Sequence, residues 1–461
     1  MPNRLPAINR LCALPVVTGL GGAGRRFRRA VREVERLEPA ALAAWQLARL
    51  NALLAHAVRA PGHRDRLAAA GCLPGSLRSL DDLARLPLLE KADLADAPAA
   101  TWLTRRPRWR HTVRTSGTTG RPLTLQLDFA WWARSLARRQ ILFARHGLRY
   151  GDREGRFWGR ANGTRGPTIR DRLGNRLTFQ FMGETANELA AEARALREFA
   201  PSYLYGYPSL VRQAARAWIE LGLPPLPGLR GIVLTAERVS AHDLRTLADA
   251  FGCPVHREYG CSEADILAFD CEHGACHVAS DHVIVEALDP CDGLGECVVT
   301  DLDNTLMPLV RYRLGDRIRF AAGPCACGRT TPVIAAIEGR TGDARYLYLP
   351  DGRRVHTVLF AYLFEDLAAG GVPVRQFKVR QTERDRVVVH LDTGDRVPPP
   401  GLAATIADAV RTRVGHRLAV EVAFGKIDRV PGTKWNYFDP LPPHLRPAGR
   451  TADRPADQPA D

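Results

Sequence analysis

Residues 114–122 read Arg-Thr-Ser-Gly-Thr-Thr-Gly-Arg-Pro, and this polar stretch gives the strongest local signal in the chain. Its two glycines permit tight bends and a close approach of the main chain to a ligand. Hydroxyl and backbone N–H groups around them suit a polyanion such as the β- and γ-phosphates of a nucleotide. No Gly-Lys-Ser/Thr follows, so this is not a Walker motif. The phosphate-contacting residues that we expect are Thr115, Ser116, Gly117, Thr118, Thr119 and Gly120.

Strand and helix patterns alternate after this loop. A long helical pattern covers about 129–146, and later strand patterns are separated by helical ones. The strand patterns lie at 202–207, 231–235, 255–259, 283–288 and 296–300, and the helical patterns at 187–199, 208–221 and 240–251. This alternation predicts an α/β architecture with parallel pairing early and a β-rich portion after about residue 280.

The chain is long enough, at 461 residues, for two or three domains. Before the loop, residues 25–59 have a helical pattern, and Ser79 is placed to cap a further helix. A polar, glycine-bearing break at 339–343 precedes a second series of elements, which predicts a separate small α+β domain. We therefore expect an N-terminal domain over 1–342, a C-terminal domain over 343–446 and a disordered tail over 447–461.

Composition excludes several classes of protein. The chain is 45% hydrophobic and 25% charged, with a formal net charge of +15. Arginine supplies almost all of this charge and is scattered among Asp and Glu without a block of five like charges, which does not support dedicated nucleic-acid binding. No run of about 18 apolar residues is present, so we expect no membrane span. A short apolar run at 11–20 lacks a clear cleavage site, and we expect a cytoplasmic protein.

Four later segments follow the loop in a fixed order: Thr235–Glu237, Glu258–Glu263, Arg311–Asp316 and Gly339–Asp343. With the loop, they resemble the motifs of the acyl-adenylate-forming superfamily, and within it the phenylacetate–CoA ligase family and its capsule-biosynthesis relatives. The resemblance extends over about residues 50–440. It implies a large N-terminal domain with mixed sheets and a β-rich subdomain, and a small mobile C-terminal α+β domain.

The resemblance also assigns roles at the nucleotide site. Thr235, Ala236 and Glu237 would line the adenine pocket, although the family usually has glycine at the position of Thr235. In the segment Glu258-Tyr259-Gly260-Cys261-Ser262-Glu263, the tyrosine would stack on adenine and the serine would contact the α-phosphate. The carboxylate of Glu263 would hold Mg²⁺, a cation that prefers oxygen ligands. Taken alone, Tyr259 is more typical of a core aromatic residue and Glu263 of a helix cap.

Three further residues complete the expected nucleotide site. Asp316 would accept hydrogen bonds from both ribose hydroxyls, because a carboxylate has two oxygens. Arg340 would contact ribose or phosphate, and Asp343 would lie at the hinge between the two domains. A lone Asp after Gly is otherwise most often a turn residue.

A lysine near the C-terminus is the expected catalytic cation. The chain has lysine only at Lys91, Lys378, Lys426 and Lys434. Where arginine replaces lysine so freely, a retained lysine more often fills a place that requires an ammonium group. Family members carry a lysine near Pro, Thr and Gly that stabilises the charge between the carboxylate and the α-phosphate. Lys434 is the candidate and Lys426 the alternative, whereas either would otherwise be a solvated surface lysine.

Cysteine and histidine spacing suggests a metal site. Cys271, His277, Cys325 and Cys327 supply four ligands of the kind that structural zinc takes in tetrahedral geometry. Relatives of the phenylacetate–CoA ligase branch often carry this arrangement. The Cys-x-Cys pair is tighter than the common Cys-x-x-Cys, and buried or free cysteines are the alternative. Cys276, His273 and His282 are substitute ligands, and we expect no role for the metal in the chemistry.

The acid substrate would lie between the phosphate loop and the strand at 202–207. Trp158, Tyr205, Gly206 and Tyr207 would form aromatic walls that suit an aryl or arylacetic acid. Arg160 and Asn162 would recognise a further polar group on it. The same aromatic residues are equally typical of a core.

The expected activity is an AMP-forming ligase. A carboxylic acid and Mg-ATP would give an acyl-adenylate and pyrophosphate, and the acyl group would pass to coenzyme A. Transfer to an amine, a hydroxyl or another acceptor is an alternative, as is a nucleotide-binding protein without catalysis. The expected partners are the acid, ATP and coenzyme A, and we expect neither nucleic acid nor a membrane as a partner. For the oligomeric state, a homodimer is an alternative to a monomer.

Overall fold

The computed structural model describes most of the chain. It covers residues 22–72, 74–106, 109–114, 123–149, 151–158, 171–172, 174–179, 186–237, 239, 241–291, 293–338, 346–351, 354–374, 376–394, 396–414, 418–427, 437–442 and 445. The chain divides into two compact units, the first within residues 1–341 and the second mainly residues 342–461. Each unit is described by itself.

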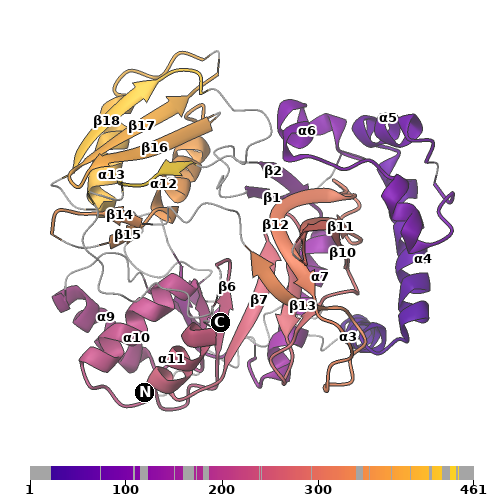
Figure 1. The fold of residues 1–461 in the computed structure, drawn as a ribbon, viewed down its shortest axis with the longest axis horizontal. Helices are drawn as coiled ribbons and strands as arrows, with labels where there is room; N and C mark the ends of the chain where they lie inside the picture. The colour runs from indigo at the N-terminus through magenta and orange to yellow at the C-terminus, as the bar shows by residue number, and fades with distance from the viewer. Residues whose placement is uncertain are drawn as a thin grey trace, which may run out of the picture. The chain divides into compact units, whose positions relative to one another are not determined.

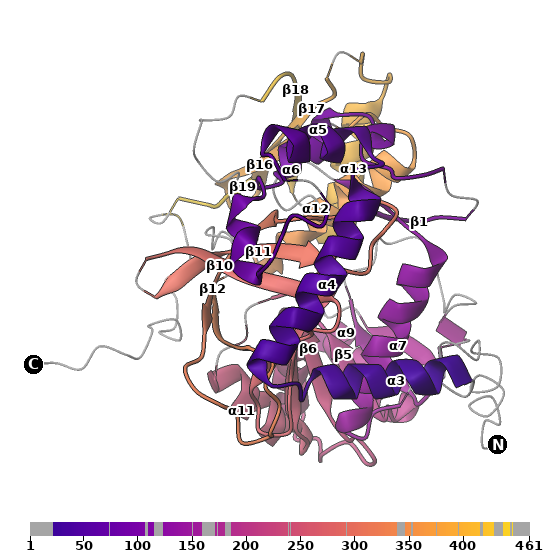
Figure 2. The same cartoon turned by 90° about the vertical axis from the view of Figure 1, so that its right-hand side faces the viewer.

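The described part of the first unit begins with helices α3 (Gly22–Val34), α4 (Pro39–Ala57) and α5 (Pro61–Ala69). The helical pattern of residues 25–59 is therefore interrupted before Pro39. Proline disfavours helical backbone in the residue before it, and Glu38 has φ −53° and ψ 148°. Pro39 then takes the first turn of α4, where its missing N–H costs no hydrogen bond. In Figure 2, α4 extends between α3 and α5.

Short elements lead from these helices to the predicted phosphate loop. The helix expected at Ser79 is the 3-10 helix η1 (Leu80–Arg85), with a capping box between Ser79 and Asp82. Helix α6 (Lys91–Asp96) and the 3-10 helix η2 (Ala99–Thr101) follow. Strands β1 (His111–Arg114) and β2 (Thr124–Leu127) then pair antiparallel on the two sides of the loop sequence.

Helix α7 (Phe129–Arg145) matches the long helical pattern predicted at 129–146. The Asp128 side chain caps it by accepting a hydrogen bond from the Trp131 backbone N–H. Leu142 and Phe143 near its end pack with Tyr203, Val233 and other residues of the central sheet. Figure 1 shows α10 and α11 on the other side of β6 and β7.

Among the described residues, the central sheet has eleven strands in the order β10-β11-β12-β13-β9-β8-β7-β6-β5-β3-β4. Its parallel half consists of β3 (Glu154–Phe157), β4 (Arg176–Phe179), β5 (Tyr203–Gly206), β6 (Ile232–Thr235) and β7 (Val255–Cys261). Helices α9 (Ala186–Phe199), α10 (Pro208–Glu220) and α11 (Ala241–Phe251) lie between these strands in the sequence. The α/β prediction is confirmed, and the carboxyl ends of β3, β5, β6 and β7 share one edge.

The antiparallel half follows β7. It consists of β8 (Asp265–Asp270), β9 (Cys276–Val278), β10 (Val283–Cys291), β11 (Leu294–Asp301), β12 (Tyr312–Phe320) and β13 (Val333–Glu338). Residues of these strands form a buried core with Leu89, Leu123 and Leu125, which belong to the segments before α7. The β-rich portion begins at β8, earlier than the sequence indicated.

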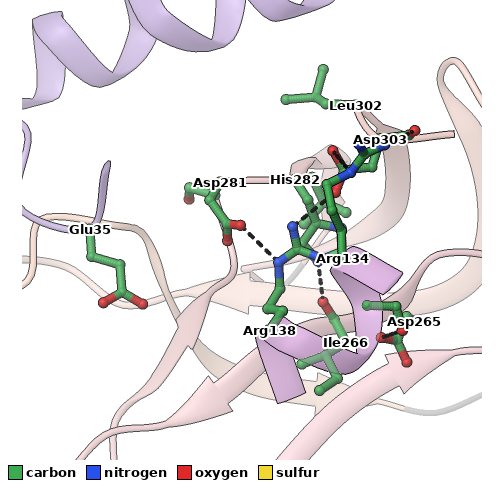
Figure 3. Close-up of polar contacts among 12 residues, drawn as sticks. Glu35, Arg134, Arg138, Asp265, Ile266, Asp281, His282, Leu302 and Asp303 are labelled. Carbon is green, nitrogen blue, oxygen red and sulfur yellow. Dashed lines mark hydrogen bonds and ion pairs between the residues drawn. The ribbon is translucent and has the colours of Figure 1, made fainter. Parts of the chain in front are cut away.

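A buried ionic cluster connects α7 to the antiparallel half. The Arg138 guanidinium donates hydrogen bonds to Asp281 at 2.8 Å and to Asp303 at 2.9 Å, and it lies between the two carboxylates in Figure 3. Arg49 of α4 and Arg134 also pair with Asp303, at 2.8 and 3.1 Å. Burial would raise the pKa of Asp303, but these arginines outweigh it and hold that pKa far below its usual value. Paired charges in a buried cluster are costly to separate.

In the part of the second unit that the structure describes, there are two small sheets and two helices. Strands β14 (Tyr346–Tyr348) and β15 (Arg354–His356) form a hairpin, and a four-stranded sheet has the order β18-β17-β16-β19. Its strands are β16 (Gln376–Glu383), β17 (Arg386–Asp392), β18 (Ala419–Phe424) and β19 (Phe438–Asp439), and its helices are α12 (Val358–Ala369) and α13 (Leu402–Val414). Within the described residues of both units, no helix is both long and apolar enough to cross a bilayer.

Candidate active site

Several predicted site residues lie outside the described residues. They are the phosphate-loop residues Thr115, Ser116, Gly117, Thr118, Thr119 and Gly120, together with Arg160, Asn162, Arg340, Asp343 and Lys434. Of the two candidate lysines, only Lys426 is described, and it is exposed just after β18. The geometry given below concerns the remaining predicted residues, which all belong to the first unit.

Four predicted segments meet at the carboxyl edge of the parallel strands. Phe157, which precedes Trp158, pairs with Gly206, and Gly206 pairs in turn with Leu234. Thr235 at the end of β6 pairs with Glu258 of β7. Ligands of open α/β sheets bind in the crevice outside the carboxyl ends of the strands, so this edge is where a site is expected.

Backbone contacts at this edge require glycine at two positions. A Cβ on Gly206 would lie 2.0 Å from the Phe157 carbonyl oxygen, and one on Gly260 would lie 2.5 Å from the Asp265 carbonyl oxygen. Both contacts are with main-chain atoms that cannot move without disturbing the sheet. These two glycines therefore hold β3 against β5 and β7 against β8 at the ends that carry the site residues.

The turn after β6 contains a strained residue. Ala236 has φ +70°, a left-handed conformation that non-glycine residues rarely adopt. Such strain often lies at functional sites, where the surrounding structure fixes it. The hydroxyl of the preceding residue, Thr235, acts on the buried Glu258 and lowers its pKa, although burial dominates and raises that pKa overall. Thr235, Ala236 and Glu237 thus form a fixed turn at the carboxyl edge.

Two hydrogen bonds join the segments 258–263 and 311–316. The Tyr259 hydroxyl donates to Asp316 Oδ2 at 3.0 Å, and the Tyr312 hydroxyl donates to Glu263 Oε1 at 3.3 Å. Burial raises the pKa of Tyr259 well above its usual value, so its hydroxyl remains a donor. Glu263 is buried, whereas Asp316 is partly exposed and Ser262 is exposed. The structure thus brings together the predicted adenine, Mg²⁺ and ribose residues.

The sequence analysis missed a buried polar network beside these residues. Arg139 of α7 donates to the Tyr205 hydroxyl and to Asp265, each at 2.8 Å, and the Tyr205 hydroxyl donates to Glu258 Oε1 at 2.8 Å. Ser135, one helical turn before Arg139, donates to the other Asp265 oxygen at 2.5 Å. Ser135 and Arg139 are spaced so that both lie on one face of α7. This spacing is the sequence signal that could have indicated the network.

The predicted aromatic walls are packed against each other. Trp158 stacks on Tyr207 with 4.3 Å between ring centroids and on Tyr205 with 6.0 Å. The Arg156 guanidinium lies 4.9 Å from the centre of the Tyr205 ring, and Arg139 lies 5.5 Å from it. Tyr205 and Tyr207 are buried and Trp158 is partly exposed, so Trp158 is the member of this stack that reaches the surface.

The four predicted metal ligands lie together elsewhere in the first unit. The ligand atoms of Cys271, His277, Cys325 and Cys327 all lie within 4.8 Å of one another. Cys271 Sγ and Cys325 Sγ are 3.8 Å apart, and Cys327 Sγ is 3.2 Å from His277 Nε2. Soft thiolates and one imidazole form the donor set that structural zinc prefers.

The surroundings of the cluster orient one ligand. His277 Nδ1 lies 3.1 Å from both the carbonyl oxygen and the hydroxyl of Thr331, which leaves Nε2 directed at the cysteines. Ligating histidines commonly make such a second hydrogen bond. The substitute ligands lie outside the group found among the described residues: Cys276 is buried in β9, His273 is exposed, and the ring of His282 hydrogen-bonds the Ile266 carbonyl oxygen.

Known proteins similar to this chain carry one recurring name. A phenylacetate–coenzyme A ligase of Thermus thermophilus is 29% identical over 333 residues, which cover 68% of this chain and 73% of the relative. A phenylacetate–coenzyme A ligase of Pseudomonas putida is 30% identical over 323 residues, which cover 66% of this chain and 71% of the relative. No family model matches the chain.

Solved structures share the fold. A 2-hydroxyisobutyryl-CoA ligase in complex with 2-HIB-AMP and CoA superimposes with a TM-score of 0.61 and 22% identity, covering 89% of this chain and 92% of that one. An open conformation of the same ligase gives a TM-score of 0.57 with 20% identity over 88% of this chain and 93% of that one. The shared fold does not identify the family, but the sequence relatives do: the chain belongs to the phenylacetate–coenzyme A ligase family.

Proposed function

We propose that this protein is an ATP-dependent, AMP-forming ligase that joins a carboxylic acid to coenzyme A. Family membership supports the reaction type, and the observation that carries it onto this chain is the pair of hydrogen bonds Tyr259–Asp316 and Tyr312–Glu263. They unite the residues that the motifs assign to adenine, ribose and the metal-bound phosphates.

The first half-reaction activates the acid. A carboxylate oxygen attacks the α-phosphorus of ATP, the bond from that phosphorus to the bridging oxygen breaks, and pyrophosphate leaves. Asp316 would hold the ribose, Tyr259 the adenine, and Ser262 the α-phosphate. The Glu263 carboxylate is a hard oxygen donor, buried and hydrogen-bonded to Tyr312, and it fits a Mg²⁺ ligand. When bound, Mg²⁺ would neutralise charge on the phosphates.

The second half-reaction transfers the acyl group. The thiolate of coenzyme A attacks the acyl carbon of the adenylate, and AMP leaves as the carbon–oxygen bond to phosphate breaks.

Lys434 would stabilise the charge that develops during adenylation, with Lys426 as the alternative. Asp343 would serve as the hinge between the two units, and Arg340 would contact ribose or phosphate. These assignments rest on the motifs that the sequence retains in family order.

The acid is proposed to be aromatic or arylacetic. The stack of Trp158, Tyr207 and Tyr205 lies at the carboxyl edge, and Trp158 is its partly exposed member. An aromatic acid would extend this stack by burying its ring against the indole.

The cysteine–histidine cluster would hold structural zinc, which would stabilise the connection between β8, β9 and the 325–331 loop without entering the reaction.

Acid-dependent pyrophosphate release tests the first half-reaction, and formation of a coenzyme A thioester tests the second. A panel of benzoic, phenylacetic and short aliphatic acids is assayed with and without coenzyme A, and hydroxylamine is added in a parallel series to trap any adenylate. Release that depends on an aromatic acid, followed by a thioester, is expected. Trapped hydroxamate without any thioester would redirect the assignment to another acceptor. Absence of release with every acid would overturn the proposal.

A further inference from the structure

A small cavity lies in the first unit between helix α4, helix α7 and the segment that follows β11. We call it the arginine cavity and define it by the residues that line it, which are Arg49, Ala52, Leu53, His56, Arg134, Leu302, Asp303 and Thr305. Its volume is about 260 Å³. Drug-sized ligands occupy pockets of roughly 300–1,000 Å³, so a cavity of this size fits a smaller molecule.

One wall of the arginine cavity is a single face of α4. This face consists of Arg49, Ala52, Leu53 and His56, whose spacing places them above one another on one side of the helix. The Arg49 guanidinium lies 5.3 Å from the centre of the Trp45 ring, one turn earlier in α4. This contact helps to hold the guanidinium beside the cavity.

Asp303 holds the two arginines of the cavity in place. Its Oδ1 accepts a hydrogen bond from Arg49 Nη2 at 2.8 Å and pairs with Arg134 Nε at 3.1 Å. Its carbonyl oxygen accepts a second hydrogen bond from Arg134, at 3.0 Å, and Figure 3 shows Arg134 beside Asp303. Because Asp303 is only 2% exposed, both guanidinium groups are anchored on a buried carboxylate. Side chains fixed in this way lose little further freedom when they bind a ligand.

Both guanidinium groups retain donors that a ligand can use. An arginine side chain carries five N–H donors, and the contacts with Asp303 and a backbone carbonyl occupy only part of them. Among the described residues, the Nη1 groups of Arg49 and Arg134 have no hydrogen-bond partner, and the two side chains are 38% and 34% exposed. His56 and Thr305 add a ring and a hydroxyl to the same cavity. The cavity therefore suits a ligand that accepts several hydrogen bonds.

The charge balance around the cavity favours an anion. Three guanidinium groups pair with Asp303, and one of them, that of Arg138, also pairs with Asp281. The cluster thus has three cations for two carboxylates. Asp301 is a third carboxyl group nearby, but burial raises its pKa to about 7, so it is only partly ionised near neutral pH. The excess charge is therefore positive, and its accessible part is the pair of arginines in the cavity.

We propose that the arginine cavity binds a single phosphate group, as inorganic phosphate or as the end of a small phosphate monoester. A phosphate group presents three or more acceptor oxygens, enough to contact both guanidinium groups at once, and guanidinium geometry matches it. Thr305 and His56 are further donors, and the apolar residues of the wall leave room for a small ester group. The site differs from the nucleotide site in every residue, and the inference does not depend on the proposed function.

Calorimetry tests the site directly. Inorganic phosphate is titrated into the full-length protein at an ionic strength kept constant with chloride, and saturable binding is expected. Arg49→Ala should weaken it at least about tenfold, as loss of a hydrogen bond between charged groups does. Thr305→Val should weaken it less while leaving every ion pair of Asp303 intact, so it guards against a folding defect in Arg49→Ala. Arg64→Ala removes an exposed arginine of α5 and is the matched control that should bind normally.

Two calorimetric outcomes would overturn the proposal. One is an unmodified protein that binds no phosphate at millimolar concentration. The other is equal binding by the unmodified protein, Arg49→Ala and Thr305→Val, which would place the anion elsewhere, including the nucleotide site.

Hydrogen exchange then locates the anion, and a second probe identifies its source. Phosphate should slow amide exchange within 49–56 and 302–305 of the unmodified protein and not of Arg49→Ala. Protection confined to other segments would contradict the assignment. Glycerol 3-phosphate is titrated in parallel with inorganic phosphate. Tighter binding of the ester would identify a phosphate monoester as the ligand, and equal or weaker binding would identify inorganic phosphate.

Discussion

Tyr259 and Asp316 are joined by a hydrogen bond of 3.0 Å although three strands separate their own strands in the sheet. Between β7 and β12 lie β8, β9 and β13, so in a flat sheet the two residues would be about 19 Å apart. The sheet must therefore curve until β7 and β12 face each other. Tyr312 and Glu263 make a second bond of the same kind at 3.3 Å. This curvature brings residues of two distant motifs into contact.

The first prediction concerns the hydrogen bond between Tyr259 and Asp316. Asp316→Asn should raise the KM for ATP by at least about tenfold in the pyrophosphate-release assay, because the amide offers only one of the two acceptors that the ribose hydroxyls need. Tyr259→Phe keeps the ring and removes only the hydroxyl, so its effect should be smaller. An Asp316→Asn enzyme that binds ATP as tightly as the unmodified one would remove Asp316 from the ribose site.

The second prediction separates the two lysines. Lys434→Ala should lower the rate of adenylation by two to three orders of magnitude, roughly what loss of one charge-stabilising group costs. ATP binding and the melting temperature should change little. Lys426→Ala is the matched control, since Lys426 is an exposed residue beyond β18. The reverse pattern, with Lys426→Ala inactive and Lys434→Ala active, would exchange the two assignments.

The third prediction concerns the metal. The purified protein should contain about one zinc per chain, and Cys325→Ser should abolish zinc binding and lower the melting temperature, because a four-ligand site contributes directly to folding. The matched control is His273→Ala: this histidine is near the cluster in sequence but exposed, and its loss should leave the zinc in place. Zinc-free protein with an unaltered melt would discard the site.

A feature could be predicted from the sequence where residues close together in the chain determine it. The motif segments and the strand ends were predicted because each depends on a pattern of a few consecutive residues. Glu258, Tyr205 and Arg139 come from three elements, and no local pattern indicates that they form one network. The interruption before Pro39 was signalled by that proline, but helical spacing on both sides outweighed it.

The fourth prediction uses a buried histidine. His63 is 1% exposed, its Nε2 donates to the Pro308 carbonyl oxygen at 2.8 Å, and its ring meets Trp102 edge to face. Burial, with a smaller contribution from the Arg66 charge, lowers the pKa of His63 to about 4. The folded state therefore keeps this ring neutral, while the unfolded chain takes up a proton near pH 6.5.

The sign follows from that difference. The stability associated with His63 is fully present above about pH 6.5 and is lost as the pH falls toward about 4. Between pH 6.5 and 5 the loss amounts to about 2 kcal/mol for one such group. His63→Gln retains a donor for Pro308 and does not titrate, so its urea midpoint should fall less between pH 7.5 and 5. Parallel pH profiles for the two proteins would show that His63 is not the group responsible.

The last prediction tests the close backbone contact that holds the carboxyl edge. Gly206→Ala introduces a Cβ 2.0 Å from the Phe157 carbonyl oxygen, so β3 and β5 must separate. Gly231→Ala is a matched control just before β6, where the nearest atoms to a new Cβ are 3.5 Å away. We expect Gly231→Ala to melt within a few degrees of the unmodified protein and to keep its KM for the acid. Gly206→Ala should lose about 1–3 kcal/mol, as overpacking does. It should also raise the KM for the acid, because Trp158 and Tyr207 directly follow the two residues that are forced apart. If Gly206→Ala were destabilised with an unchanged KM for the acid, the contact would matter to the sheet alone and the aromatic stack would have to be placed outside the acid pocket.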